Sequence, residues 1–426
     1  MFVPIEMQSV PFDPADAKAT LAQLPQSSAV FALYGEEARF EPYIGRTPNL
    51  RGRLERLLQP SARHPRRLQL AGRVRRIDWR LTGSEFESLL LQLDLLQEEY
   101  GTKCLERMHL RPPAFVRFLG GNPYPRVSVS YHPSQREAEW AYGPFPSRAA
   151  AERFADETLK LFLLRRCIED LDPNPDHPGC VYSEMKMCLA PCYQGCTDER
   201  YGEEAAAVES FLAHRGESRL VVLHAERDEA SAQLDFESAA ALHAQVQRVE
   251  TVRSLASELV RPLSQLRAVI LQTSAIPDEV AVFLYENNCL SGPAGFSTQG
   301  IRIQNEQSGS TSLFAQPVAI EPTPEIPTPE ATPLAGIATP VKLVRGTLEA
   351  RLEAALALLE SPHHAPSPTL RQGHLALLKR WYYRPEARRT GEIFFPDADG
   401  RWPVKAILRG IGRVFGSRFK PVISNS

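Results

Sequence analysis

Apolar and polar positions change their spacing along the chain and predict blocks of different secondary structure. Apolar residues over 29–34, and a second run that ends at Gly45, flank a turn at Gly35; this indicates a hairpin of two short strands, with a helix beginning after Asn49. Leucines recur at helical spacing over 85–100. Apolar positions alternate over 115–145, which predicts strands, and a helix should follow from Ser147.

The second half of the chain mixes helical and extended patterns. Residues 203–255 are rich in alanine and glutamate and should form two helices that break near Gly216 and pack as a hairpin. Strand patterns return over 266–304. Repeated Thr-Pro and Pro-Glu steps indicate a linker over 316–340. Beyond it we expect helices at 345–360 and 367–383, a short hairpin at 391–402 and a last basic helix, so the fold class is α+β with several domains.

The composition limits which partners and which cellular compartment we expect for this protein. With 426 residues, 43% of them hydrophobic and 23% charged, the chain can bury proper cores and should hold roughly two to four domains. The formal charge of −2 provides no global positive field, so any contact with nucleic acid must be a local patch. No apolar run has the length of a membrane span and the first residues do not resemble a signal peptide, so we expect a cytoplasmic protein without membrane contact.

Four of the seven cysteines gather in one short stretch. Cys167, Cys180, Cys188 and Cys192 are spaced C-x12-C-x7-C-x3-C, close to turn-forming glycine and proline residues. Four thiolates can hold a tetrahedral zinc ion or the corners of an iron-sulfur cube, and the spacing leaves both open. Buried, inert cysteines are the alternative, which suits Cys104 and Cys289 best, while Cys196 is a spare ligand or has no role.

The residues around these cysteines resemble the central cysteine-rich region of the UvrC family of nucleotide-excision-repair endonuclease subunits. The resemblance is carried by runs at 142–146 and 161–167, by Cys180, by the run 188–192, and by Tyr201. In that family the four cysteines are held to bind an iron-sulfur cluster, so the resemblance implies a [4Fe-4S] centre at Cys167, Cys180, Cys188 and Cys192, with zinc as the other option.

Residues 230–240 resemble the UVR motif, the helical hairpin by which UvrC docks on the helicase subunit UvrB. From the apolar spacing we expect Leu234 and Phe236 to lie on packing faces of this hairpin together with Val246. The family usually continues with a Leu-Arg-Asp step, whereas this chain has Leu-His-Ala at 242–244. The resemblance implies a UvrB-like partner, and the residues that would bind it are Leu234, Asp235, Phe236, Glu237 and Ala240.

The hairpin and helix at 29–58 look like a GIY-YIG nuclease core, which hydrolyses DNA with one metal ion. Such chemistry needs a tyrosine to activate water, a basic group for the phosphate and a carboxylate for the metal. By its place in the motif, Tyr43 would activate water; Arg46 stands where the family usually has lysine, and Arg53 would bind phosphate. Phe31 and Gln92 stand where the family has a tyrosine and the metal-binding glutamate.

The exchange of the glutamate for Gln92 removes the anion that a hard cation prefers. Asp94 lies roughly 200° around the helix from Gln92, and Glu85 lies about 10 Å away along the axis, so neither replaces it without rearrangement. The loss of a metal carboxylate typically costs several orders of magnitude in rate. We therefore expect weak or absent cleavage, with magnesium needed only if the nuclease is active.

The C-terminal region is locally basic. Residues 367–426 contain twelve arginines and lysines against four acids, together with Trp381, Tyr382, Tyr383 and Trp402. This composition favours a DNA-binding surface with phosphates on the arginines and bases on the rings; the alternative is a solvated basic face whose aromatic rings are buried. The candidate DNA-binding residues are Arg380, Arg384, Arg388 and Arg389.

These observations give one organisation and three functional hypotheses. The predicted units are a degenerate GIY-YIG-like domain at 27–105, the cysteine-rich region at 110–200, the UVR hairpin at 203–255, a strand region at 266–310, the linker at 316–340 and a basic C-terminal region at 341–420. After 255 we find neither the acidic signature of the RNase H-like domain of UvrC nor its helix-hairpin-helix repeats.

The first hypothesis is a UvrC-like repair protein that binds DNA and a UvrB-like helicase subunit with little or no nuclease activity. The alternatives are an active single-incision endonuclease and a protein-interaction scaffold without DNA contact.

Overall fold

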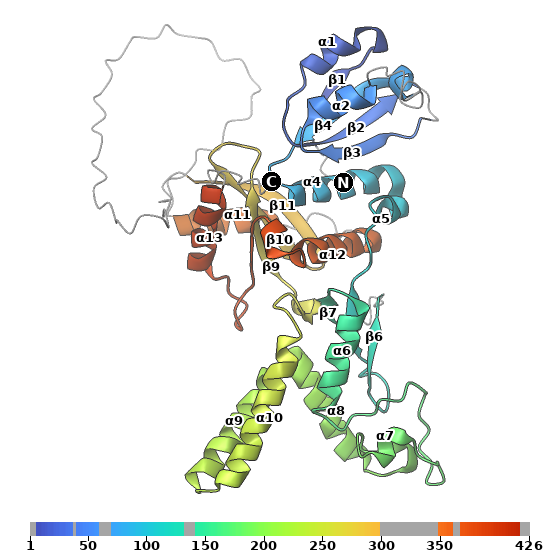
Figure 1. Ribbon diagram of the computed structural model, residues 1–426, viewed down its shortest axis with the longest axis vertical. Coiled ribbons are helices and arrows are strands. Elements are labelled where there is room, and N and C mark those ends of the chain that lie inside the picture. The colour runs from blue at the N-terminus through green and yellow to red at the C-terminus, as the bar shows by residue number, and fades with distance from the viewer. Residues whose placement is uncertain are drawn as a thin grey trace, which may run out of the picture.

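The computed structural model describes residues 6–36, 40–58, 70–131, 141–298, 348–360 and 367–417. The predicted linker at 316–340 lies outside these residues. Helices and antiparallel sheets are combined in several units, which confirms the α+β, multi-domain class (Figure 1). In the described part of the chain no helix is long and apolar enough to cross a membrane.

The N-terminal unit is a sheet with helices on both faces. Its strands lie in the order β1-β4-β2-β3, so β3 is at an edge. Because side chains alternate across a strand, Phe31 and Leu33 of β2 pack with α1 and α2, whereas Val30 and Ala32 pack with α4. The elements are β1 (Gln8–Pro11), α1 (Ala17–Ala22), β2 (Ala29–Gly35), β3 (Tyr43–Thr47), α2 (Leu50–Leu58), β4 (Val74–Leu81), α4 (Glu85–Tyr100) and α5 (Cys104–Arg107).

The C-terminal unit is a second antiparallel sheet, in the order β11-β10-β9-β12. Its helices α11 and α13 share an apolar cluster with one face of the sheet, and α12 shares a cluster with the other face. The elements are β9 (Ala268–Thr273), β10 (Glu279–Glu286), β11 (Cys289–Ser297), α11 (Leu348–Glu360), α12 (Pro368–Tyr382), β12 (Glu392–Phe394) and α13 (Val404–Ser417). The strand region at 266–310 and the basic region at 341–420 therefore contribute to one sheet.

A difference from the sequence prediction concerns residues 391–402. We expected a short hairpin, but the segment supplies the single strand β12, which pairs antiparallel with β9 through Ile393 opposite Ile270. The partner strand is more than a hundred residues away in the sequence, so local alternation identified an extended segment but not its neighbour.

Helix α4 lies between the two sheets (Figure 1). It begins after Ser84, whose hydroxyl accepts the backbone N–H of Glu87 at 3.1 Å. Phe86 packs edge-on against Phe283 of β10 and Trp381 of α12, with ring centroids 5.2 and 5.3 Å apart. At the crossing with α12, a Cβ on Gly373 would come within 2.8 Å of Leu93 Cδ2, so glycine permits the close approach of the two helices.

The middle unit carries the cysteines. Its sheet has the order β6-β5-β7-β8 and packs with α6 and α8 around Phe145, Phe154 and Phe211. The elements are β5 (Ala114–Phe118), β6 (Val127–Ser130), β7 (Ala141–Phe145), α6 (Arg148–Leu159), α7 (Val181–Glu184), α8 (Asp198–Ala213) and β8 (Arg261–Pro262).

A pair of antiparallel helices, α9 (Glu217–Ala232) and α10 (Phe236–Ser254), extends away from the middle unit (Figure 1). We predicted two helices over 203–255 with one break near Gly216. The structure has three, because the chain also turns at Leu234, whose φ is +64°. The hairpin is thus formed by α9 and α10, while α8 belongs to the core of the middle unit.

The shared helix α4 leads to a stability prediction. Replacement of Phe86, which is 1% exposed, by alanine should lower the free energy of unfolding by about 3 to 5 kcal/mol, because a buried aromatic contact between the units is lost. Urea titrations should show this loss at two probes, Trp79 in β4 and Trp381 in α12. Each probe is followed in a separate variant, in which it is retained and the other tryptophan is replaced. Glu98→Ala, at an exposed position of the same helix, is the control; a loss at only one tryptophan would contradict the shared core.

Candidate functional site

The four predicted ligand cysteines line one cavity in the middle unit. Cys167 lies in the segment between α6 and α7, Cys180 precedes α7, and Cys188 and Cys192 follow it. Leu171, Tyr182 and Pro191 complete the wall together with Arg165 and Arg166. The structure thus brings together thiols that are up to 25 residues apart in the sequence, whereas Cys196, Cys104 and Cys289 do not line this cavity.

The thiols of the cavity are free and partly buried. Burial raises the pKa of Cys188 and Cys192, and the neighbouring cysteines raise it further because thiolates repel one another. Backbone hydrogen bonds at Ala190 and Tyr193 oppose this by stabilising the two thiolates. Within the described residues, no group of three or more His, Cys, Asp or Glu side chains converges on a position for one metal ion.

Arg165 is a component of this cavity to which the sequence analysis gave no role. Its side chain is 1% exposed. Nε donates to the carbonyl of Tyr124 at 3.0 Å, and Nη1 donates to the carbonyl of Glu169 at 2.8 Å and lies 3.5 Å from Cys167 Sγ. Nη2 is buried without a hydrogen-bond partner. The only signal in the sequence was its place two residues before Cys167, which says nothing about burial.

The residues of the nuclease-like centre are divided between two faces of the N-terminal sheet. Tyr43 is 38% exposed and its ring centroid lies 6.0 Å from that of Phe31 on the face covered by α2, the helix that carries Arg53. A Cβ on Gly45 would lie 3.0 Å from Phe31 Cζ, so the glycine accommodates the phenyl ring. Arg46, three positions after Tyr43, points to the other face, toward Glu85 at the start of α4.

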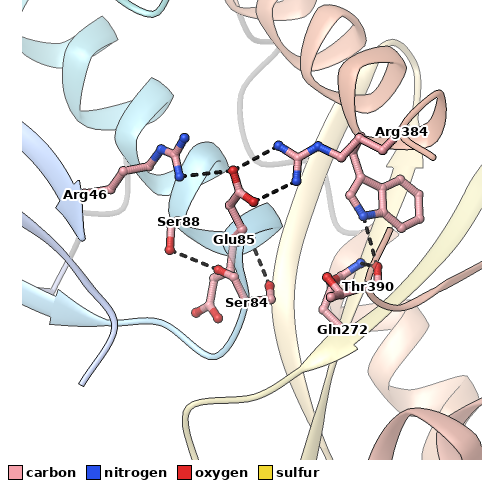
Figure 2. A network of polar contacts seen from close by, with 9 residues as sticks. Arg46, Ser84, Glu85, Ser88, Gln272, Arg384 and Thr390 are labelled. Carbon is pink, nitrogen blue, oxygen red and sulfur yellow. Dashed lines mark hydrogen bonds and ion pairs between the residues drawn. The ribbon is translucent and has the colours of Figure 1, made fainter. Parts of the chain in front are cut away.

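Glu85 joins Arg46 to the C-terminal unit (Figure 2). Its carboxylate lies 3.2 Å from Arg46 Nη1 and accepts two hydrogen bonds from Arg384, at 2.7 and 2.9 Å. The hydrogen bonds of Arg384, followed by the charges of Arg384 and Arg46, lower the pKa of Glu85 against the effect of partial burial. The acid nearest to Arg46 is therefore neutralised by two guanidinium groups.

The remaining polar residues of α4 also have partners. The amide of Gln92 donates to the carbonyl of Ile44 in β3 at 3.5 Å. Asp94 Oδ1 lies 3.4 Å from Nε2 of His374 in α12. On its other side, Nδ1 of His374 accepts the backbone N–H of Leu290 at 3.1 Å, so Nε2 carries the proton that is donated to Asp94. Both acids considered as substitutes for the metal-binding glutamate are thus engaged by the C-terminal unit.

The candidate DNA-binding arginines have different environments. Arg380 and Arg388 are exposed. Arg384 is bound to Glu85, and Arg389 donates to the carbonyl of Tyr382 at 3.1 Å and lies over the rings of Tyr382 and Trp381. Trp381 is 1% exposed and donates through its indole N–H to the carbonyl of Thr390, so for this ring the alternative of burial in a core holds and stacking on bases does not. Its burial follows from its position on the face of α12 that packs against Phe86 of α4.

The predicted partner-binding residues lie at the free end of the helical hairpin. Leu234 and Phe236 are 73% and 66% exposed, whereas Val246, toward the base of α10, is buried. The expectation that Leu234 and Phe236 pack inside the hairpin is therefore wrong, because both lie where the chain reverses. Asp235 accepts the backbone N–H of Ser238 at 3.1 Å and caps α10, and Glu237 and Ala240 are exposed in the following turns.

Glu85 gives a prediction about the contact between the units. Glu85→Ala should lower the free energy of unfolding by about 1 kcal/mol in low salt, and less in high salt, because the ion pairs are partly exposed. Since the folded-state pKa of Glu85 is lowered, its stabilisation is present at neutral pH and is lost as the pH falls through that pKa.

Urea titrations at two salt concentrations and at pH 7 and pH 3 measure this effect. The control is Glu36→Ala, which removes an exposed ion pair with Arg75 inside the N-terminal unit. An equal effect of the two substitutions would contradict a special role of Glu85 between the units.

The middle of the chain is similar to proteins of a known family. Residues 116–211 match the family model described as UvrC/Cho excinuclease, middle domain. The UvrABC system protein C of Pseudomonas entomophila is 30% identical over 241 residues, which is 56% of this chain and 39% of that protein. The proteins of the same name from Pseudomonas aeruginosa and Pseudomonas putida are 28% and 29% identical over 56% of this chain. This chain thus matches about two fifths of the length of these relatives, and no solved structure matches it.

Proposed function

We propose that this chain is a member of the UvrC family that acts in nucleotide-excision repair as a DNA-binding and partner-binding component whose nuclease is inactive or weak. The observation that carries the proposal is that the region matched by the UvrC/Cho middle domain contains the four cysteines, and that these line one cavity. The relatives are named as parts of the UvrABC system, so a UvrB-like helicase subunit and DNA are the proposed partners.

The chemistry of α4 supports the loss of nuclease activity. Gln92 offers an amide in place of a carboxylate and uses it to bind the backbone of β3. Glu85 and Asp94 interact with Arg384 and His374, so a metal ion would have to displace these contacts before either acid became a ligand. Several orders of magnitude in rate depend on the metal in such a centre.

We propose a [4Fe-4S] cluster for the cysteine cavity, held by Cys167, Cys180, Cys188 and Cys192. The donor set fits, because iron in such clusters is bound by four thiolates. The hydrogen bonds at Cys188 and Cys192, together with the buried guanidinium of Arg165, suit an anionic group in the cavity. When bound, the cluster would supply a rigid charged centre that fixes the cysteine segments. Zinc is the alternative that metal analysis distinguishes.

The helical hairpin is the proposed docking site for the UvrB-like subunit. Leu234 and Phe236 present apolar surface at its free end, and Asp235 and Glu237 add negative charge beside them. No side chain over 224–245 is buried, so this half of the hairpin depends on the two helices alone. A partner can therefore cover the tip without displacing another part of the described chain.

DNA contact is proposed for the exposed arginines of the C-terminal unit. Arg380 and Arg388 are accessible to phosphate, whereas Arg384 is available only if Glu85 releases it. Such contacts depend on salt, because each bound phosphate releases counterions.

The proposed loss of activity is tested on supercoiled plasmid with magnesium or manganese. The chain should nick it no faster than its Tyr43→Phe and Arg53→Ala variants, because the centre lacks a metal carboxylate. Arg56→Ala is the control, since Arg56 lies on the same helix as Arg53 but outside the motif. Nicking that persists in Arg56→Ala and disappears in Tyr43→Phe or Arg53→Ala would show an active endonuclease instead.

The proposed docking site is tested with Phe236→Ala in a pull-down with UvrB. The substitution should weaken binding at least about tenfold, as expected for an aromatic residue at the centre of an interface. Circular dichroism should remain unchanged, because the side chain is exposed. Gln245→Ala, at an exposed position further along α10, is the matched control. Unchanged binding by Phe236→Ala would count against this surface.

A further inference from the structure

We propose that Arg165 is the counter-cation of the cysteine cavity, and that its free Nη2 donates a hydrogen bond to a sulfur atom of the bound iron-sulfur cluster. The inference rests on the cofactor proposed above and assigns a role to a residue that is not a ligand. In the described structure Arg165 is buried, but its charge is not balanced by a carboxylate and one of its nitrogens has no hydrogen-bond partner.

The contacts of Arg165 leave one nitrogen for a group in the cavity. Nε and Nη1 are bound by the carbonyls of Tyr124 and Glu169, and Nη1 also approaches Cys167 Sγ at 3.5 Å. These partners are two backbone carbonyls and one cysteine sulfur, and none of them is a carboxylate. Among the described residues, no carboxylate lies within ion-pair distance of Arg165, although such pairs are found for many other arginines of the chain. The sulfur atoms of the cavity are therefore the remaining source of negative charge.

Electrostatics indicates when this arrangement is favourable. A buried cation without a counter-charge costs several kcal/mol, and in the described structure Arg165 is buried with no carboxylate beside it and with Nη2 without a partner. Metal binding deprotonates the cysteines, and a cluster held by four thiolates carries net negative charge. Arg165 should therefore destabilise the metal-free form and stabilise the loaded one.

The surrounding residues hold Arg165 in place for this role. The backbone N–H of Arg165 donates to the Tyr201 hydroxyl at 3.2 Å, and that hydroxyl donates to the carbonyl of Pro125 at 2.8 Å. Tyr124, whose carbonyl binds Nε, packs edge-on against the ring of Tyr201 at 5.6 Å between centroids. Arg166 also lines the cavity and has a buried Nε without a partner, so a second cation lies beside the first.

The test compares Arg165→Met, which removes the charge but keeps much of the apolar stem, with Arg165→Lys, which keeps the charge but not the planar fork. Arg200→Gln is the control, because Arg200 is half-exposed and binds Glu204 outside the cavity. Full-length protein is purified without oxygen, and iron and acid-labile sulfide per chain are measured. The rate at which an iron chelator bleaches the visible absorption, and the melting temperatures of the loaded and chelated forms, are then determined.

Opposite effects on the two forms are expected. Arg165→Met should lose the cluster roughly tenfold faster than the parent, a factor that corresponds to about 1.4 kcal/mol. The chelated form of the same variant should melt at the same temperature or higher, because an uncompensated buried charge is gone. Arg165→Lys should fall between Arg165→Met and the parent in bleaching rate, and Arg200→Gln should match the parent.

Other outcomes separate this inference from the cofactor proposal. A lower melting temperature of both forms by the same amount, with unchanged bleaching, would mean that Arg165 only holds Tyr124 and Glu169, and would overturn the inference. If the protein contains zinc in place of iron, the cluster proposal is overturned. The role of counter-cation is then overturned as well if Arg165→Met releases zinc as slowly as the parent does. A parent protein that binds neither metal under these conditions would refute both.

Discussion

The double-sided burial of α4 is the constraint on which the arrangement of the N-terminal and C-terminal units depends. Leucines at 89–91, 93, 95 and 96 are buried around the helix, so it contacts one sheet on one side and α12 and β10 on the other. A helix in this position exposes few side chains to water, and its polar residues need partners within the interface. Glu85, Gln92 and Asp94 find them in Arg384, the carbonyl of Ile44 and His374. The helix that would hold the metal of a nuclease thus stabilises the contact between two units.

Much of the local structure could be predicted from the sequence, because strands and helices are encoded by short-range periodicity. The strands around Gly35 and the helix at 85–100 followed from it, as did the helical character of 203–255, whereas the second break at Leu234 did not. The pairing of β12 with β9 did not, since alternation shows that a segment is extended but not which strand it meets. The same limit applies to α4: leucines in consecutive positions signal burial on more than one side, but the second partner, α12, lies more than 260 residues further along the chain.

The site was predictable where residue identity alone carries the chemistry. The short spacing of four cysteines predicted that they come together, and the structure places all four around one cavity, while the metal centre stays a prediction. The role that we propose for Arg165 depends on its burial, which arises from tertiary contacts with Tyr124 and Tyr201 that no local pattern reveals. Leu234 and Phe236 show the opposite case. Their apolar character suggested a core, but the reversal of the chain at Leu234 leaves both exposed at the tip.

The contacts of α12 explain how the two core units are attached to the middle unit. The hydroxyl of Tyr383, just after α12, donates to the carbonyl of Pro144 in β7 at 2.9 Å and lies 2.9 Å from the hydroxyl of Ser257, which then acts as the donor to it. Burial raises the pKa of Tyr383, so this hydroxyl keeps its proton and the contact with Pro144 throughout the neutral range. Since α12 also contacts α4 through His374, one helix connects all three sheets. The free half of the hairpin over 224–245 is outside this framework, so its surface is accessible to the partner that we propose.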